Sequence, residues 1–138
     1  MIGQVLAQGD YQKAVSDYKQ GQYSKAIQEF HAIIKENPDY ETGHRILGDI
    51  YLRIKSYDKA VESFKESLRL QEDNFFSHYG LALAYYNTGR YKDTIATLRK
   101  AERIARSPRD RYQLFHIRGS AYFNTQKFRR AASDLKKA

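Results

Sequence analysis

Two of the four histidines lie in a regular pattern, and histidine is a common metal ligand. His44 and His78 are 34 residues apart and occupy the same place in a repeated sequence, so we expect them in neighbouring structural units. A zinc ion needs its ligands at about 2 Å, whereas packed helices lie about 8–10 Å apart. We therefore expect no metal and no other cofactor, and a packing role for these two side chains.

Residue patterns for catalysis are absent from the sequence. It contains no glycine-rich phosphate loop and no Gly-x-Ser-x-Gly turn, and its carboxylates are scattered. It also contains no cysteine, which excludes a disulfide, a thiol nucleophile and a thiolate metal site. We therefore expect a non-catalytic protein without a small-molecule substrate.

The positive charge is unevenly distributed along the chain. Residues 1–70 contain 10 Lys and Arg against 10 Asp and Glu, whereas residues 71–138 contain 14 against 6. A basic surface formed by residues 71–138 could follow a phosphate backbone, and nucleic-acid binding is the alternative function. We favour a solvated face or a docking site for an acidic protein, because these charges should lie on outer helices and loops, away from any aromatic platform. The predicted basic surface comprises Arg99, Arg103, Arg106, Arg109, Arg111, Arg129 and Arg130.

Membrane and targeting segments are not evident. No apolar run approaches the roughly 20 residues that span a bilayer, and residues 1–9 do not resemble a signal peptide. A mean hydropathy of −0.76 suits an elongated structure in which every helix keeps a wet face. We expect no membrane insertion; the compartment stays open, with the cytoplasm slightly favoured.

The elements that position these residues follow from an internal repeat. The segment that begins at Gly21 recurs from Lys55, Gly89 and Gln126, with an aromatic residue two positions later each time. Two antiparallel helices can pack closely only where small side chains meet at their crossing. Each copy supplies one small residue in a first helix and one in a second: Ala14, Gly48, Ala82 and Gly119 face Ala26, Ala60, Thr94 and Ala131. Large apolar residues should then fill the inner face of each second helix: Phe30, Phe64, Leu98 and Leu135.

Helix starts are predicted from polar residues beside turn sequences. Asp39 and Ser56 are expected to cap the helices that follow them. Ser107, Pro108 and Asp110 combine a cap, a proline in the first turn and an early acid. Three extra residues precede the fourth copy, and we interpret them as an added turn on its first helix.

The 34-residue period with these residues resembles the tetratricopeptide repeat family over nearly the whole chain. The resemblance implies an all-α fold, an α-solenoid of about four antiparallel helix-turn-helix repeats forming a right-handed superhelix. It implies a single array over residues 1–138, with repeats at about 7–40, 41–74, 75–108 and 112–138. The family's proline at the end of each repeat is kept only as Pro38, and Asp17 and Arg118 also depart from its pattern. From these departures we expect looser packing in the outer repeats.

The last repeat breaks off within its second helix. A repeat array needs a polar capping element at its end, because the last repeat otherwise exposes the face meant for its neighbour. We therefore expect a fragment of a longer protein. End-to-end self-association is the alternative.

The resemblance also implies a concave groove, lined by the first helix of each repeat, that binds a protein or peptide partner. Aromatic residues and arginine dominate binding energy at protein interfaces. The side chains that chaperone-tail receptors of this family use to hold a terminal carboxylate have no counterparts here, so we do not expect that ligand. The expected groove residues are Tyr11, Tyr18, Arg45, Asp49, Arg53, Phe76, Tyr79, Tyr86, Asn87, His116, Phe123 and Asn124.

Overall fold

The computed structural model describes residues 2–125 and 128–138, and these residues form eight α-helices and no strand. Within them, no helix is long and apolar enough to cross a membrane. The helices are α1 (Ile2–Lys19), α2 (Tyr23–Glu36), α3 (Glu41–Arg53), α4 (Tyr57–Leu70), α5 (Phe75–Asn87), α6 (Tyr91–Glu102), α7 (Pro108–Asn124) and α8 (Phe128–Lys137).

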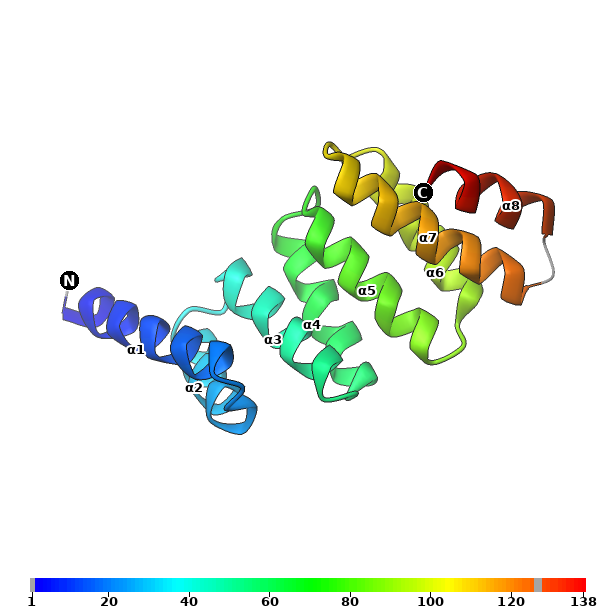
Figure 1. Ribbon diagram of the computed structural model, residues 1–138. Coiled ribbons are helices and arrows are strands. Elements are labelled where there is room, and N and C mark those ends of the chain that lie inside the picture. The colour runs from blue at the N-terminus through cyan, green and yellow to red at the C-terminus, as the bar shows by residue number, and fades with distance from the viewer. Residues whose placement is uncertain (1, 126–127) are drawn as a thin grey trace.

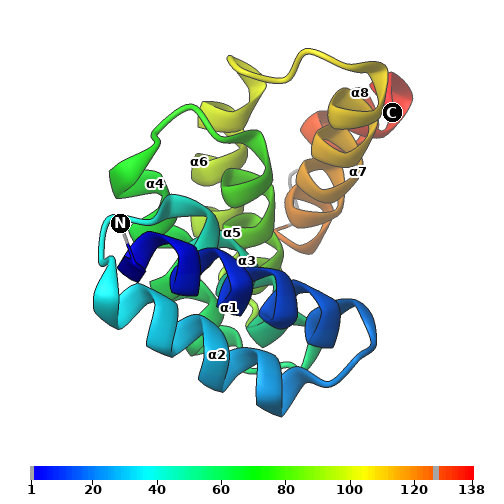
Figure 2. The same cartoon turned by 90° about the vertical axis from the view of Figure 1, so that its left-hand side faces the viewer.

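The helices form successive antiparallel pairs that follow one another from α1 and α2 at one end to α7 and α8 at the other (Figure 1). Each helix packs against the next one in the chain, and α5 also contacts α3 and α7. Figure 2 looks along the array from its N-terminal end, with α7 and α8 to one side. The predicted all-α solenoid of helix pairs is confirmed.

Small residues meet at the helix crossings, as predicted. Ala14, Ala26, Ala60 and Ala82 are completely buried. Gly48 and Gly119 are buried as well. The side chain of Ala131 lies outside the described residues. These contacts let the two helices of each pair approach closely.

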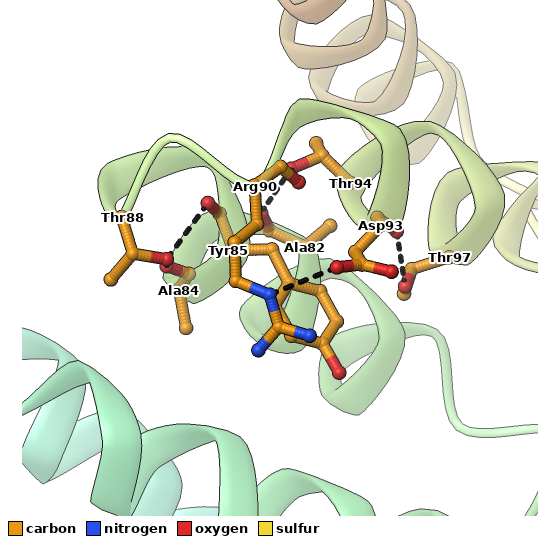
Figure 3. Close-up of polar contacts among 8 residues, drawn as sticks. All are labelled: Ala82, Ala84, Tyr85, Thr88, Arg90, Asp93, Thr94 and Thr97. Atoms are coloured by element: carbon orange, nitrogen blue, oxygen red, sulfur yellow. Dashed lines mark hydrogen bonds and ion pairs between the residues drawn. The ribbon is translucent and has the colours of Figure 1, made fainter.

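The crossing of α5 and α6 contains a threonine where the sequences of the other three repeats have alanine. Thr94 is completely buried, and its hydroxyl donates to the carbonyl oxygens of Arg90 at 3.0 Å and Ala82 at 3.4 Å. Beside it, the Arg90 guanidinium carbon lies 4.4 Å from the ring centre of Tyr85, and its Nε donates to Asp93 at 2.9 Å (Figure 3). The hydroxyl is therefore accommodated because it bonds across the crossing.

Phe64 of α4 packs between the second and third pairs. Its ring is 2% exposed and lies against the backbone of two glycines, Gly48 of α3 and Gly80 of α5. A Cβ atom added to Gly48 would come within 2.8 Å of the ring, and one added to Gly80 within 2.3 Å. Both glycines are thus required for the close approach of this ring.

The other predicted inner-face residues divide. Phe30 and Leu98 are completely buried, as expected. Leu135 of α8 is 44% exposed, so its predicted burial is wrong. Phe64, in contrast, is buried and covered by α5, the first helix of the next pair.

Each of the first three pairs turns through a residue with a left-handed backbone. Gly21, Lys55 and Gly89 have φ of 75°, 62° and 76°, and they are 34 residues apart. Glycine adopts this conformation without a steric penalty, whereas lysine does not. In each turn the next residue donates its backbone N–H to the carbonyl five residues earlier: Gln22 to Asp17, Ser56 to Tyr51 and Arg90 to Tyr85, at 2.8, 2.8 and 2.9 Å.

The predicted helix starts are partly confirmed. Ser107 and Asp110 bond to each other's backbone N–H at 3.0 and 3.2 Å and form a capping box. The helix after it, α7, has 17 residues against 13 in α3 and α5, which confirms the added turn. Ser56 stands at the cap position without a capping hydrogen bond, and the cap predicted at Asp39 is wrong, because α3 begins after Tyr40.

Arg118 departs from the repeat pattern, and we expected loose packing around it. The structure shows close packing there instead. The Arg118 guanidinium is buried and donates to Asp134 of α8 at 2.6 and 3.1 Å and to Glu102 of α6 at 2.7 Å. Its pKa is raised by these hydrogen bonds against the effect of burial. The charge that replaces a large apolar residue therefore joins three helices.

Candidate functional site

A surface depression of about 450 Å³ lies over the first helices, and we call it the groove. Of the twelve side chains predicted for the binding surface, seven line it: Tyr11, Tyr18, Arg45, Asp49, Arg53, Phe76 and Tyr79. Its other lining residues are Val15, Lys19, Ile46, Leu52, Phe64, Gly80, Leu83, Arg109 and Gln113. The groove thus draws on α1, α3, α5 and the start of α7, with Phe64 reaching it from α4.

A closed polar cluster links α1 to α3 at one side of the groove. The Tyr18 hydroxyl donates to Asp49, and Arg53 Nε donates to the same carboxylate oxygen at 2.8 Å. The guanidinium carbon of Arg53 also lies 5.7 Å from the ring centre of Tyr18. Burial raises the pKa of Tyr18, and its bond to Asp49 raises it further. The hydrogen bond to Asp49 likewise raises the pKa of Arg53. The negative charge of Asp49 is therefore balanced by Arg53 within the protein.

Arg45 shares its carboxylate partner with two neutral groups. Its Nε lies 3.6 Å from Oε1 of Glu41. The same oxygen accepts hydrogen bonds from Ser67 Oγ at 2.7 Å and Asn74 Nδ2 at 2.9 Å. Since Arg45 contributes the longest of these contacts, its guanidinium keeps donors for a ligand in the groove.

An aromatic pair from α5 forms another part of the groove. Phe76 is 67% exposed, the highest exposure among the large apolar side chains described. Tyr79 is half-buried and stacks on Phe75, with ring centres 6.1 Å apart and planes 8° apart. Burial raises the pKa of Tyr79, whereas the charge of Arg109 lowers it. The pair presents one rigid ring to solvent beside another that is held in place.

Five of the predicted binding residues do not line the groove. Tyr86 and Asn87 lie at the end of α5, and Asn124 of α7 donates to the Tyr86 hydroxyl at 3.2 Å. His116 stacks on Tyr112 with ring centres 5.9 Å apart, and Phe123 is 59% exposed. They lie further along the first helices, towards the C-terminal end of the array.

Arg109 was predicted to lie on the outer basic surface, and this prediction is wrong. It lines the groove with Gln113, because both lie on the N-terminal part of α7, where the added turn extends that helix. The added turn was visible in the sequence as a break in the period. Its consequence for Arg109 was missed, because the residue lies outside the regular repeat.

The remaining basic residues are divided between separate places. Arg99 donates to the Tyr122 hydroxyl at 3.3 Å, and the guanidinium carbon of Arg130 lies 5.8 Å from the centre of the same ring. Arg103 lines a depression that also contains Glu72 and Asp73. Arg106 and Arg111 are exposed, and the side chain of Arg129 lies outside the described residues.

The two histidines of the repeat bind backbone. His44 Nε2 lies 2.8 Å from the Pro38 carbonyl oxygen, and His78 Nε2 lies 2.8 Å from that of Glu72. Both bonds hold the connection between one repeat and the next. Among the described residues, no group of three or more His, Asp or Glu side chains could hold a metal ion.

Comparison with known proteins agrees with this architecture. The sequence model of the tetratricopeptide repeat matches residues 11–75 and 57–110, which together cover more than half of the chain. A solved structure of MamA from Desulfovibrio magneticus RS-1, residues 41 to the end, has a TM-score of 0.86 and 21% identity. The match covers 95% of this chain and 72% of that one. At this identity the likeness concerns the fold alone.

Curated relatives match over about half of the chain. Tetratricopeptide repeat protein 37 of Xenopus laevis is 31% identical over 75 residues, 54% of this chain. Superkiller complex protein 3 of Mus musculus is 31% identical over 78 residues, 56% of this chain. These matches span only 5% of each relative's length. From the repeat period, the helix pairs and the match to the family's sequence model, the chain belongs to the tetratricopeptide repeat family.

Proposed function

We propose that the chain is a non-catalytic adaptor that holds a peptide or helix of a partner protein in the groove. Tetratricopeptide repeat proteins are protein–protein interaction modules. The name of one relative, superkiller complex protein 3, places that protein in a complex. Both facts support a role in assembly for this chain.

The observation that carries the proposal is the solvent-facing ring of Phe76 inside the groove. A large apolar side chain that is 67% exposed contributes little to folding. The same ring becomes a strong anchor when a partner covers it, since aromatic residues and arginine dominate interface energies. Tyr79 and Arg45 line the same groove and supply both residue types.

A selection of displayed random peptides on the intact chain tests the proposal. The selected peptides are labelled, and their dissociation constants are measured by fluorescence anisotropy. The double variant Phe76→Ala/Arg45→Ala should bind them at least tenfold more weakly, about 1.4 kcal/mol. Phe76 is exposed and Arg45 has only a 3.6 Å contact to Glu41, so the variant should stay folded.

Leu135→Ala is the matched control, because Leu135 is an exposed apolar residue of α8 that does not line the groove. It should leave the affinities unchanged. Equal binding by the wild type and the double variant would contradict the proposal, as would a selection that recovers no peptide.

A further inference from the structure

We infer that the segment held in the groove is acidic and carries apolar side chains between its carboxylates. This inference rests on the proposed function and adds the chemistry of the partner. It follows from the charges of the groove, from the way they are already paired, and from the apolar surface between them.

The charged residues of the groove are mostly cations. Four basic side chains line it, from α1, α3 and the start of α7, against one carboxylate, that of Asp49. That carboxylate is neutralised by Arg53 at 2.8 Å and accepts a hydrogen bond from Tyr18. The basic residues are Lys19, Arg45, Arg53 and Arg109.

Two of the four cations, Lys19 and Arg109, have no ion-pair partner among the described residues. Lys19 lies in the last turn of α1, and Arg109 lies in the first turn of α7. A ligand with carboxylates can therefore be held at more than one point.

Arg109 is placed against the preference of its own helix. A helix N-terminus carries partial positive charge, so a cation in the first turn destabilises the helix. In the same turn, the carboxylate of Asp110 accepts hydrogen bonds from the backbone N–H groups of Arg106 and Ser107. Since Asp110 already supplies the acid of this turn, the charge of Arg109 is what favours a further anion at this side of the groove.

Aliphatic side chains lie among these cations. Val15, Leu52 and Leu83 come from three successive first helices and line the groove together with Ile46 and Phe76. The apolar side chains of a peptide can pack on this aliphatic surface, whereas the bases of single-stranded RNA could stack only on the aromatic side chains of the groove, so the whole surface fits a peptide better than single-stranded RNA. Carboxylates at the cations and apolar side chains at the aliphatic surface define the occupant.

The test uses a labelled peptide built of glutamate, leucine and phenylalanine, and two sister peptides in which glutamine or lysine replaces every glutamate. Dissociation constants are measured at low and at high salt. The glutamate peptide should bind tightest, and its affinity should fall as salt is added. The variant Lys19→Gln/Arg109→Gln should bind it about tenfold more weakly at low salt, as expected for two exposed charge pairs.

The control variant is Lys92→Gln/Arg111→Gln, which loses the same charge at exposed residues outside the groove. It should change the affinity less than twofold. If it weakens binding as much as the groove variant does, the attraction comes from overall charge and the inference is overturned. No binding of the glutamate peptide also overturns it.

Two outcomes separate this inference from the proposed function. If the glutamine peptide binds as tightly as the glutamate peptide, and Phe76→Ala weakens both, the groove holds peptides without selecting for acid. In that case only the inference fails. If Phe76→Ala changes the binding of none of the three peptides, the proposed function fails as well. Single-stranded oligouridylate that binds through Lys19 and Arg109 and that the glutamate peptide cannot displace would overturn the inference in favour of nucleic acid.

Discussion

Gly80→Ala is predicted to destabilise the protein, although alanine is the better helix former. The new Cβ atom would lie 2.3 Å from Cζ of Phe64 and 2.7 Å from both of its Cε atoms. Carbon atoms in contact prefer about 3.5–4.0 Å, so the ring would have to move by roughly 1 Å. It cannot retreat towards α3, because the ring already packs on the backbone of Gly48. The space there is so small that an added Cβ atom would lie 2.8 Å from the ring.

The expected size of the effect is the difference between two opposing contributions. Overpacking of a buried core costs about 1–3 kcal/mol. Replacing glycine by alanine within a helix returns about 1 kcal/mol. We therefore expect the free energy of unfolding to fall by up to about 2 kcal/mol, measured by urea denaturation with far-UV circular dichroism.

The same substitution in a Phe64→Leu background is the control. Without the ring, only the helix preference remains, and Gly80→Ala should be neutral or stabilising by up to about 1 kcal/mol. If Gly80→Ala stabilises the wild type as much as it stabilises the Phe64→Leu variant, the contact between Gly80 and Phe64 does not limit the packing of α4 and α5.

Three further predictions concern the turns and the buried polar groups. Lys55→Gly should raise the free energy of unfolding by about 0.5–1 kcal/mol, because it relieves the left-handed backbone, while Lys59→Gly within α4 should lower it. Asp134→Ala should lower the free energy of unfolding by about 3 kcal/mol, because it leaves Arg118 buried without its closest carboxylate. Replacing both residues by leucine should restore the stability. An equal loss of stability in the double variant would contradict this prediction. Burial lowers the pKa of His78 below its ordinary 6.5, so below that pH the unfolded chain binds a proton that the folded chain does not, and stability is lost as the pH falls towards the folded pKa. His78→Gln should therefore destabilise the protein more at neutral pH than at about pH 5, and a constant difference in unfolding free energy would refute this.

The fold could be predicted from the sequence because its determinants are local and repeated. Small residues at the same place in successive repeats, such as Ala26 and Ala60, fix where two helices cross. Seven of the expected binding residues line one groove because the period also fixes which face of each first helix they occupy. The residues whose roles repeat were therefore placed correctly on their helices.

Features that break the repeat could not be predicted in the same way. The partners of Arg118, Glu102 and Asp134, are each 16 residues away, and only the packed helices bring them together. Arg109 lies in the added turn of α7, where no other repeat offers a comparison. The cap of α3 was misplaced because the chain continues past Asp39 to Tyr40 before the helix begins.

The backbone contacts of the two repeat histidines also needed the structure. Their 34-residue spacing correctly indicated neighbouring repeats. It could not show that each ring binds the carbonyl oxygen six residues earlier, at Pro38 and Glu72. That contact gives His78 a structural role and leaves its Nδ1 buried without a partner among the described residues, which explains why protonation is unfavourable.

Photo-cross-linking of a bound peptide tests the central claim, that the groove holds a partner segment, most directly. A photoreactive phenylalanine analogue is placed at Phe76 in one variant and at Ala96, an exposed residue of α6 outside the groove, in another. Each variant is irradiated with the same selected peptide, and the products are identified by mass spectrometry. We predict a cross-link to position 76 and none to position 96. A cross-link at position 96 that equals or exceeds the one at position 76 would contradict the account.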